Sequence, residues 1–344
     1  MATQLAQPSQ EPQGINSPRL QRRPWWLLFW FALPVVLWWS FRSFSVGEIW
    51  TTLRNLSLGS ILVLFVLNAF VLVSFSSRWW LILRAQGCQV SYWSLVGYRL
   101  AGFGITYFTP GPQLGGEPLQ VHLLTRRNNI PSTVAIASVT LDKMLELLAN
   151  FTFLLVGIIT ILLSGVLGEG TNYLWLLLPA GLLVIPAGYL LALWRGALPV
   201  TKILRKLARR FPGSQRLARW PDTLQAVEEE TGQFFHGHPG TLLVAILISI
   251  LVWILLVFEF GLAVRFLGIS LSLAEVITLL TAARLAFLLP IPAGIGTLET
   301  GQMLAMGMIG ASPMIGISLS LLIRVRDAVL GGFGLWWGGW LTRN

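Results

Sequence analysis

The stretch LLPIPAGIGTLE, Leu288–Glu299, places two prolines, two glycines and a carboxylate within one of the most apolar regions of the chain. Proline and glycine both disfavour a continuous helix, and a carboxylate is costly in hydrocarbon. A membrane helix that runs through this stretch would therefore break inside the membrane. Backbone groups freed by such a break are tolerated only where they are buried in protein or line a water-filled cavity. The stretch predicts an environment of that kind.

Composition indicates an all-α polytopic membrane protein. The chain has 344 residues, of which 55% are hydrophobic and only 11% charged, whereas soluble domains carry about 25% charged residues. Its apolar runs are long enough for spanning helices. The formal net charge of +10 marks cytoplasmic loops and contact with anionic lipid headgroups. We expect no nucleic-acid partner, because the chain has no soluble basic domain that could bind one. The single cysteine, Cys88, excludes an intrachain disulfide and a cysteine-based metal cluster, and we expect no cofactor.

The apolar runs predict about six full spans. They lie at roughly 24–44, 59–84, 131–165, 172–195, 241–265 and 313–341. Two further apolar regions, about 95–124 and 275–310, are interrupted by proline and glycine, and eight crossings result if these regions also cross. Basic clusters flank the first, third and fourth spans, so we expect both termini to be cytoplasmic in an inner or plasma membrane. The polar residues 1–23 are expected to form a disordered cytoplasmic N-terminus.

The chain contains an internal repeat, with copies at 59–165 and 240–341. Matched positions differ by 180 to 182 residues: Gly59 with Gly240, Arg84 with Arg265, Pro110 and Pro112 with Pro290 and Pro292, Glu117 with Glu299, and Asp142 with Arg324. An ordered series of this length is difficult to attribute to chance. We expect the copies to form one transmembrane domain, 24–344, joined by the span 172–195 and a basic cytoplasmic linker, 196–239.

The two copies are expected to have opposite topology, because the span 59–84 runs inward and the span 241–265 runs outward. Each broken region would then be a re-entrant helical hairpin. Inverted repeats with broken helices are the architecture of many transporters, whose site lies near the midplane between the copies. The motif residues expected to form the breaks are Pro110, Pro112, Gly115, Gly116, Pro290, Pro292, Gly294 and Gly296.

Charged residues are expected at membrane depth. Asp142 lies 11 residues after Pro131, which is about 17 Å along a helix and near the middle of a hydrocarbon layer about 30 Å thick. Glu146 shares a helix face with Asp142, and Lys143 can reach Glu146. In the second copy we expect Arg324 to approach Asp327, three residues on, with Arg326 turned elsewhere.

Ten residues are candidates for binding a lipid headgroup, five basic and five acidic. They are Arg99, Glu117, Asp142, Lys143, Glu146, Arg284, Glu299, Arg324, Arg326 and Asp327. Intramembrane ionisable groups are functional by default, but paired ones can serve only to hold the copies together, and both interpretations stay open. Arginine binds phosphate in a bidentate manner, so the first choices for a phosphate site are Arg99, Arg284, Arg324 and Arg326.

Four charged residues, two of them among these ten, have more specific interpretations. Glu117 and Glu299 either face a cavity or satisfy amides freed at the start of the next helix. Arg78 and Glu259 occupy matched positions in the two copies and are expected to be structural.

The segment Pro199–Phe211 spaces three apolar residues four apart among basic ones. It is expected to be either an interfacial helix on an anionic leaflet or an ordinary cytoplasmic loop. His236 and His238 lie in one loop without a third ligand, so no metal site is expected.

Two motifs resemble the paired signatures of a known family. The GGE of Gly115–Glu117 and the PIPAGIGTLE of Pro290–Glu299 are similar to those of the flippase-like integral membrane family related to the transmembrane region of lysylphosphatidylglycerol synthases. The likeness covers nearly all of 24–341. The resemblance implies a polytopic helical protein that moves lipids between leaflets. The full synthases add a soluble aminoacyl-transfer domain, which this sequence is expected to lack because it ends at Asn344.

The favoured hypothesis is a lipid translocase, not an enzyme, that moves a phospholipid or lipid-linked headgroup through a central charged cavity. The alternatives are an intramembrane enzyme acting on a lipid-linked substrate and an accessory subunit of a lipid-modifying complex. A homo-oligomer stays open.

Overall fold

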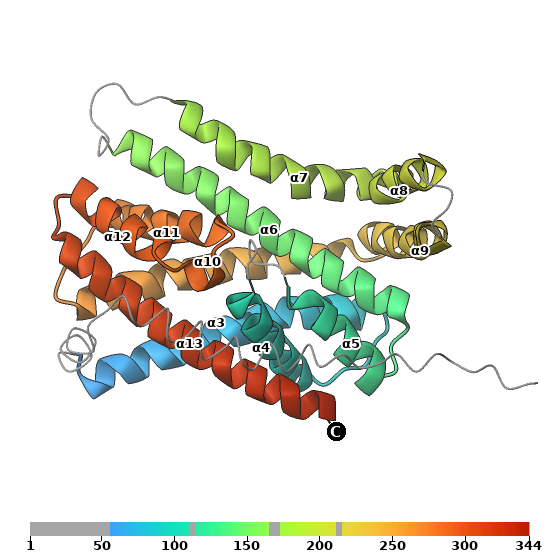
Figure 1. Cartoon of the computed structure of the whole chain (residues 1–344), viewed down its shortest axis with the longest axis horizontal. Coiled ribbons are helices and arrows are strands. Elements are labelled where there is room, and N and C mark those ends of the chain that lie inside the picture. Colours follow the sequence, from blue (N-terminus) through green and yellow to red (C-terminus); the bar gives the residue numbers. More distant parts are fainter. Residues whose placement is uncertain (1–55, 110–114, 165–172, 211–214, 344) are drawn as a thin grey trace, which may run out of the picture.

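The structure, a computed structural model, describes residues 56–109, 115–164, 173–210 and 215–343, which form helices and connecting turns without a strand. Its long apolar helices are α3 (Leu58–Ala85), α6 (Ser132–Leu163), α7 (Leu177–Trp194, preceded by the 3-10 helix η1, Tyr173–Leu176), α10 (Pro239–Phe266) and α13 (Pro313–Arg343). They run through the bundle in Figure 1. The expected disordered residues 1–23 and the span at 24–44 lie outside the described residues.

These helices match the five expected spans that lie in the described part of the chain. By length and composition, α3, α6, α10 and the segment Leu174–Trp194 are sufficient to cross a membrane. Helix α13 has 31 residues, about 46 Å of helix, but it contains three charged residues near its middle. The boundaries of these five segments differ from the predicted ones by at most two residues. Pro131, for example, is the cap of α6, and the helix begins at Ser132.

Each broken region is a helical hairpin. The first consists of α4 (Tyr92–Phe108) and α5 (Glu117–Arg127), and the second of α11 (Leu273–Leu288), the 3-10 helix η2 (Pro292–Gly294) and α12 (Thr297–Met308). In the first, the Tyr98 hydroxyl donates to the Asn128 side chain at 3.0 Å, while Gly116 lies against Gly102. In the second, Gln302 donates to the Leu279 carbonyl at 2.8 Å. The two arms of each hairpin are therefore antiparallel, and both outer ends lie on the same side of the bundle.

The two hairpins enter the bundle from opposite ends. Helices α3 and α10 are antiparallel, because Asn68 donates to Glu259 at 3.2 Å and Arg78 donates to Ser249 at 2.9 Å. Since α4 begins where α3 ends and α11 begins where α10 ends, the hairpins point toward each other, as Figure 1 shows for α5 and α12. Their tips meet where Tyr107 and Phe108 pack with Ala293. This arrangement confirms an all-α inverted repeat with two broken hairpins.

The backbone at the second tip explains the glycines of the opening motif. Ala293, Gly294 and Gly296 have φ angles of 52°, 61° and 79°. Glycine adopts this left-handed conformation without steric cost, whereas it costs about 1–2 kcal/mol for a residue such as alanine. Helix α11 ends at Leu288, two residues before Pro290. Pro110 and Pro112 of the first motif lie outside the described residues.

Each copy packs its last helix on the hairpin of the other copy. A Cβ atom on Gly334 of α13 would lie 2.1 Å from the carbonyl oxygen of Leu100 in α4. The equivalent contact in the other half joins α6 to α11, where a Cβ atom on Gly157 would lie 2.0 Å from the Thr281 hydroxyl. Small residues at these crossings allow the close backbone approach that is typical of membrane helices.

Two further helices, α8 (Pro199–Arg210) and α9 (Gln215–Gly237), follow α7. The buried carboxylate of Glu228 in α9 accepts the backbone N–H groups of Val200 and Thr201 at 3.0 Å, which fixes the start of α8. Ile203 and Leu207 are exposed between basic residues. The segment is therefore an amphipathic helix, and its contact with anionic headgroups stays a prediction.

Gly334→Ala is expected to destabilise the protein by about 1–3 kcal/mol, because the added methyl group overpacks the α4–α13 crossing. Gly332→Ala is the control, since a Cβ atom there would meet no atom within 4 Å and alanine favours a helix. Thermal unfolding in detergent measures both variants. Equal stability of the two would contradict the close packing of α13 on α4.

Candidate functional site

A cavity of about 290 Å³ lies between the two hairpins. Helices α3, α4, α5 and α6 of the first copy line it together with α10, α11, η2 and α13 of the second. Among the described residues, nine charged side chains line it: Arg99, Glu117, Asp142, Lys143, Glu146, Glu259, Arg284, Arg326 and Asp327. Eight of the ten candidate residues are among them, and the exceptions are Glu299 and Arg324. The sequence therefore predicted a set of residues that the fold brings together from α4, α5 and α6 of the first copy and from α11 and α13 of the second.

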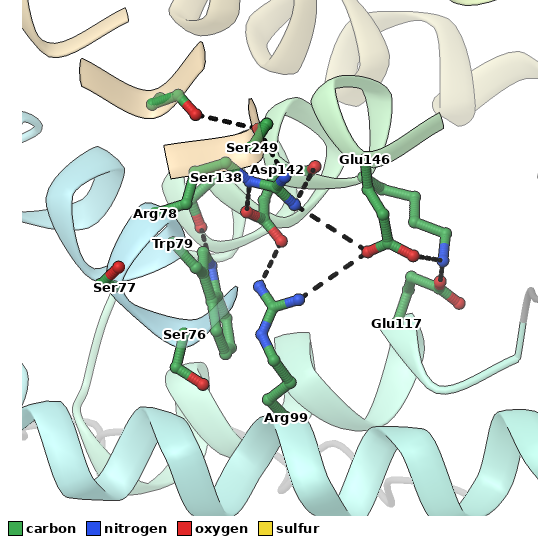
Figure 2. Close-up of polar contacts among 12 residues, drawn as sticks. Ser76, Ser77, Arg78, Trp79, Arg99, Glu117, Ser138, Asp142, Glu146 and Ser249 are labelled. Carbon is green, nitrogen blue, oxygen red and sulfur yellow. Dashed lines mark hydrogen bonds and ion pairs between the residues drawn. The ribbon is translucent and has the colours of Figure 1, made fainter. Parts of the chain in front are cut away.

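Asp142 is the centre of the charged network in the first copy. Its carboxylate accepts the Nε–H of Arg78 at 2.7 Å and also an N–H of Arg99. Figure 2 shows both guanidinium groups converging on Asp142, with Glu146 beside them. Arg78 also donates to Ser249 of α10, so the pair is joined to the second copy. Asp142 and Arg78 are only 5% and 1% exposed, so this ion pair is held away from bulk water.

Lys143 links the break in the first copy to α6. Its ammonium lies 3.2 Å from Glu117 and 3.0 Å from Glu146, which confirms the expected pairing with Glu146. The other Glu117 oxygen accepts the backbone N–H of Gly115 at 2.8 Å. Both interpretations of Glu117 therefore describe part of its geometry, because it faces the cavity and also satisfies an amide freed at the break.

The second copy contains a group of three charges on α10 and α13. Arg326 lies 2.5 Å from Glu259 and 2.8 Å from Asp327. The expectation that Arg324 pairs with Asp327 and that Arg326 turns elsewhere is therefore wrong. Tertiary contact decides the outcome: Glu259 of α10 lies beside Arg326 and accepts from it.

Arg324 instead binds Glu299 and the Gly294 carbonyl, both from the second break. Its side chain is 1% exposed. This contact supports the backbone at the hairpin tip and favours a structural interpretation of both residues.

Arg284 of α11 differs from the other cavity cations. No carboxylate lies within ion-pair distance of it in the described part of the chain. Its guanidinium lies 4.9 Å from the ring centre of Trp253, and this ring stacks on Phe153 at 4.0 Å. Cation–π contact stabilises an arginine without occupying most of its N–H donors. Arg284 also lines a second cavity of about 30 Å³, which shares Glu146 with the large one.

The sequence predicts Arg78 and Glu259 to be structural residues outside the site. The structure places Glu259 in the cavity wall. Arg78 does not line the cavity but binds Asp142, which does. The signal that could have identified them is that they occupy matched positions of the repeat and have opposite charges. At such a position, each residue can form an ion pair with the last helix of its own copy.

Asp142→Asn is expected to lower the stability of the protein by about 3–5 kcal/mol, because it removes the closest carboxylate of two buried arginines. Glu146→Gln should cost much less, since the Glu146 side chain is 25% exposed and its contacts with the two arginines are 3.7 and 4.0 Å long. Thermal unfolding in detergent compares them. If both variants were equally stable, Asp142 would not be the centre of the network.

Comparison with known proteins agrees with this architecture. The family model described as the lysylphosphatidylglycerol synthase TM region matches residues 26–332. A UPF0104 membrane protein of Methanothermobacter thermautotrophicus is 24% identical over 287 residues, which cover 81% of this chain and 84% of the relative. One from Methanocaldococcus jannaschii is 25% identical over 300 residues, which cover 83% and 85%. The chain is therefore an integral membrane protein that belongs to the lysylphosphatidylglycerol synthase transmembrane-region family, a family of lipid metabolism or translocation.

Proposed function

We propose that the protein is a lipid translocase, which moves the headgroup of a phospholipid or lipid-linked molecule between leaflets through the cavity between the hairpins. The observation that supports this most directly is the position of the cavity. It lies where two oppositely directed hairpins meet, and charged residues from both copies line it. Transporters with inverted repeats bind their substrates at an equivalent place.

The surface of the bundle favours a lipid substrate. The outward faces of α3 and α10 expose large apolar side chains, such as Phe65, Phe70 and Ile254, which suit contact with acyl chains. The interior provides the polar groups that a headgroup needs in order to leave water. A lipid would therefore place its headgroup in the cavity and keep its tails in the bilayer.

The same geometry supports alternating access. Polar contacts join α3 to α10 near the centre, through Asn68 and Glu259 and through Arg78 and Ser249. We propose that one copy rocks against the other about these contacts, so that the cavity faces each leaflet in turn.

Leu330→Trp is expected to reduce lipid flipping by about tenfold or more, because the larger side chain fills space that a headgroup requires. Leu330 lines the cavity, whereas the neighbouring Val329 is 61% exposed on the outer surface. Val329→Trp is therefore the matched control and should flip at the parental rate. Purified protein in proteoliposomes, with fluorescent lipid and a membrane-impermeant quencher, provides the measurement.

Parental flipping by Leu330→Trp would contradict transport through this cavity. Parental protein that flips no lipid but converts a lipid-linked donor into product would favour the intramembrane enzyme.

A further inference from the structure

We propose that the cavity selects a zwitterionic headgroup, one that contains both a phosphate and a primary ammonium. The phosphate would bind Arg284 on α11, and the ammonium would bind the carboxylates of Glu259 and Asp327 on α10 and α13. The proposal rests on the proposed function and specifies its substrate class.

The distribution of charge separates the two halves of the cavity. In the first copy, three cations and three carboxylates balance: Arg78, Arg99 and Lys143 against Glu117, Asp142 and Glu146. In the second copy, the group on α10 and α13 has one cation, Arg326, which contacts the two carboxylates of Glu259 and Asp327. With every group ionised, this group of three has one surplus negative charge. Arg284 on α11 provides a positive charge with no carboxylate within ion-pair distance among the described residues.

Arg284 has the geometry of an anion site. It is in contact with the face of Trp253, which leaves its planar N–H groups available to an acceptor. A lipid phosphate offers oxygens that match the guanidinium fork. Arg99 and Arg326 are already bound to carboxylates in the described residues, as are Arg78 and Arg324, so Arg284 is the arginine of the network best suited to a new anion.

Glu259 and Asp327 have the geometry of a cation site. Glu259 is 3% exposed, and while one oxygen accepts from Asn68 and Arg326, the other has no hydrogen-bond donor within the described residues. A buried acceptor without a hydrogen-bond donor lowers the stability of the protein. Asp327 accepts a hydrogen bond from the same arginine, Arg326. An ammonium group bound beside Arg326 at these carboxylates would supply the missing donor and neutralise the surplus charge.

The overall balance then favours a zwitterion over an anion. A headgroup with phosphate and ammonium adds no net charge to the cavity. A headgroup with phosphate alone would neutralise Arg284 but leave the surplus carboxylate uncompensated in a poorly solvated site, which is costly.

The test is competition for binding, which does not depend on transport. Purified protein is incubated with equal amounts of phosphatidylethanolamine and phosphatidylglycerol with identical acyl chains, and native mass spectrometry measures the lipid retained. The parental protein should prefer phosphatidylethanolamine by about tenfold, the factor expected from one charge-assisted hydrogen bond. Asp327→Asn should reduce this preference to about threefold or less, since the surplus charge is gone. Arg284→Gln should weaken retention of both lipids by a similar factor and leave their ratio nearly unchanged.

Arg265→Gln and Glu229→Gln, at positions outside the cavity, are the matched controls and should behave as the parent. Thermal unfolding verifies that each variant is folded, and Arg284→Lys should restore part of the retention because it restores the charge. Equal retention of the two lipids by the parental protein, or a preference for phosphatidylglycerol, would overturn the proposal without the use of any variant. So would an unchanged ratio in a folded Asp327→Asn protein. If the selectivity is found but no lipid is flipped, the substrate class stands and the translocase proposal fails.

Discussion

The structure depends on the cost of placing charge and unpaired backbone inside an apolar bundle. Neither broken hairpin could exist alone in hydrocarbon, because its tip frees backbone groups and its helices contain charges that lipid cannot solvate. Each copy therefore shields the polar part of the other. The tips meet at Tyr107, Phe108 and Ala293, and the last helix of each copy covers the hairpin of its counterpart. The cavity is the space that remains where these polar surfaces face each other.

The repeat conserves this arrangement while exchanging the signs of its charges. In the first copy the basic residue Arg78 on α3 binds the acidic Asp142 on α6. In the second copy the acidic residue Glu259 on α10 binds the basic Arg326 on α13. The two copies therefore form an ion pair between equivalent helices, with the positions of the basic and the acidic residue exchanged. The copies also differ in Asp327 and Arg284, and our proposal on headgroup selection depends on these two residues.

Much of the fold was predictable because its determinants are local. Proline and glycine specify the second break, and the long apolar runs specify the spans. The pairing of Lys143 with Glu146 followed from their spacing on one helix. The partner of Arg324 did not follow from spacing. Arg324 binds Glu299, in the first turn of α12, and not Asp327 on its own helix. Similarly, Arg284 has no carboxylate partner within the described part of the chain because α11 packs against Trp253, and no pattern within α11 predicts this contact.

The central claim is that water reaches the space between the copies, and thiol labelling tests it most directly. In a Cys88→Ser background, Leu330→Cys and Val329→Cys place neighbouring probes at nearly the same depth of α13, one in the cavity wall and the other on the outer surface. The account predicts that a membrane-impermeant thiol reagent modifies Leu330→Cys in liposomes, while Val329→Cys stays protected by lipid. Protection of both positions would show that the space between the hairpins is dry and would contradict the account.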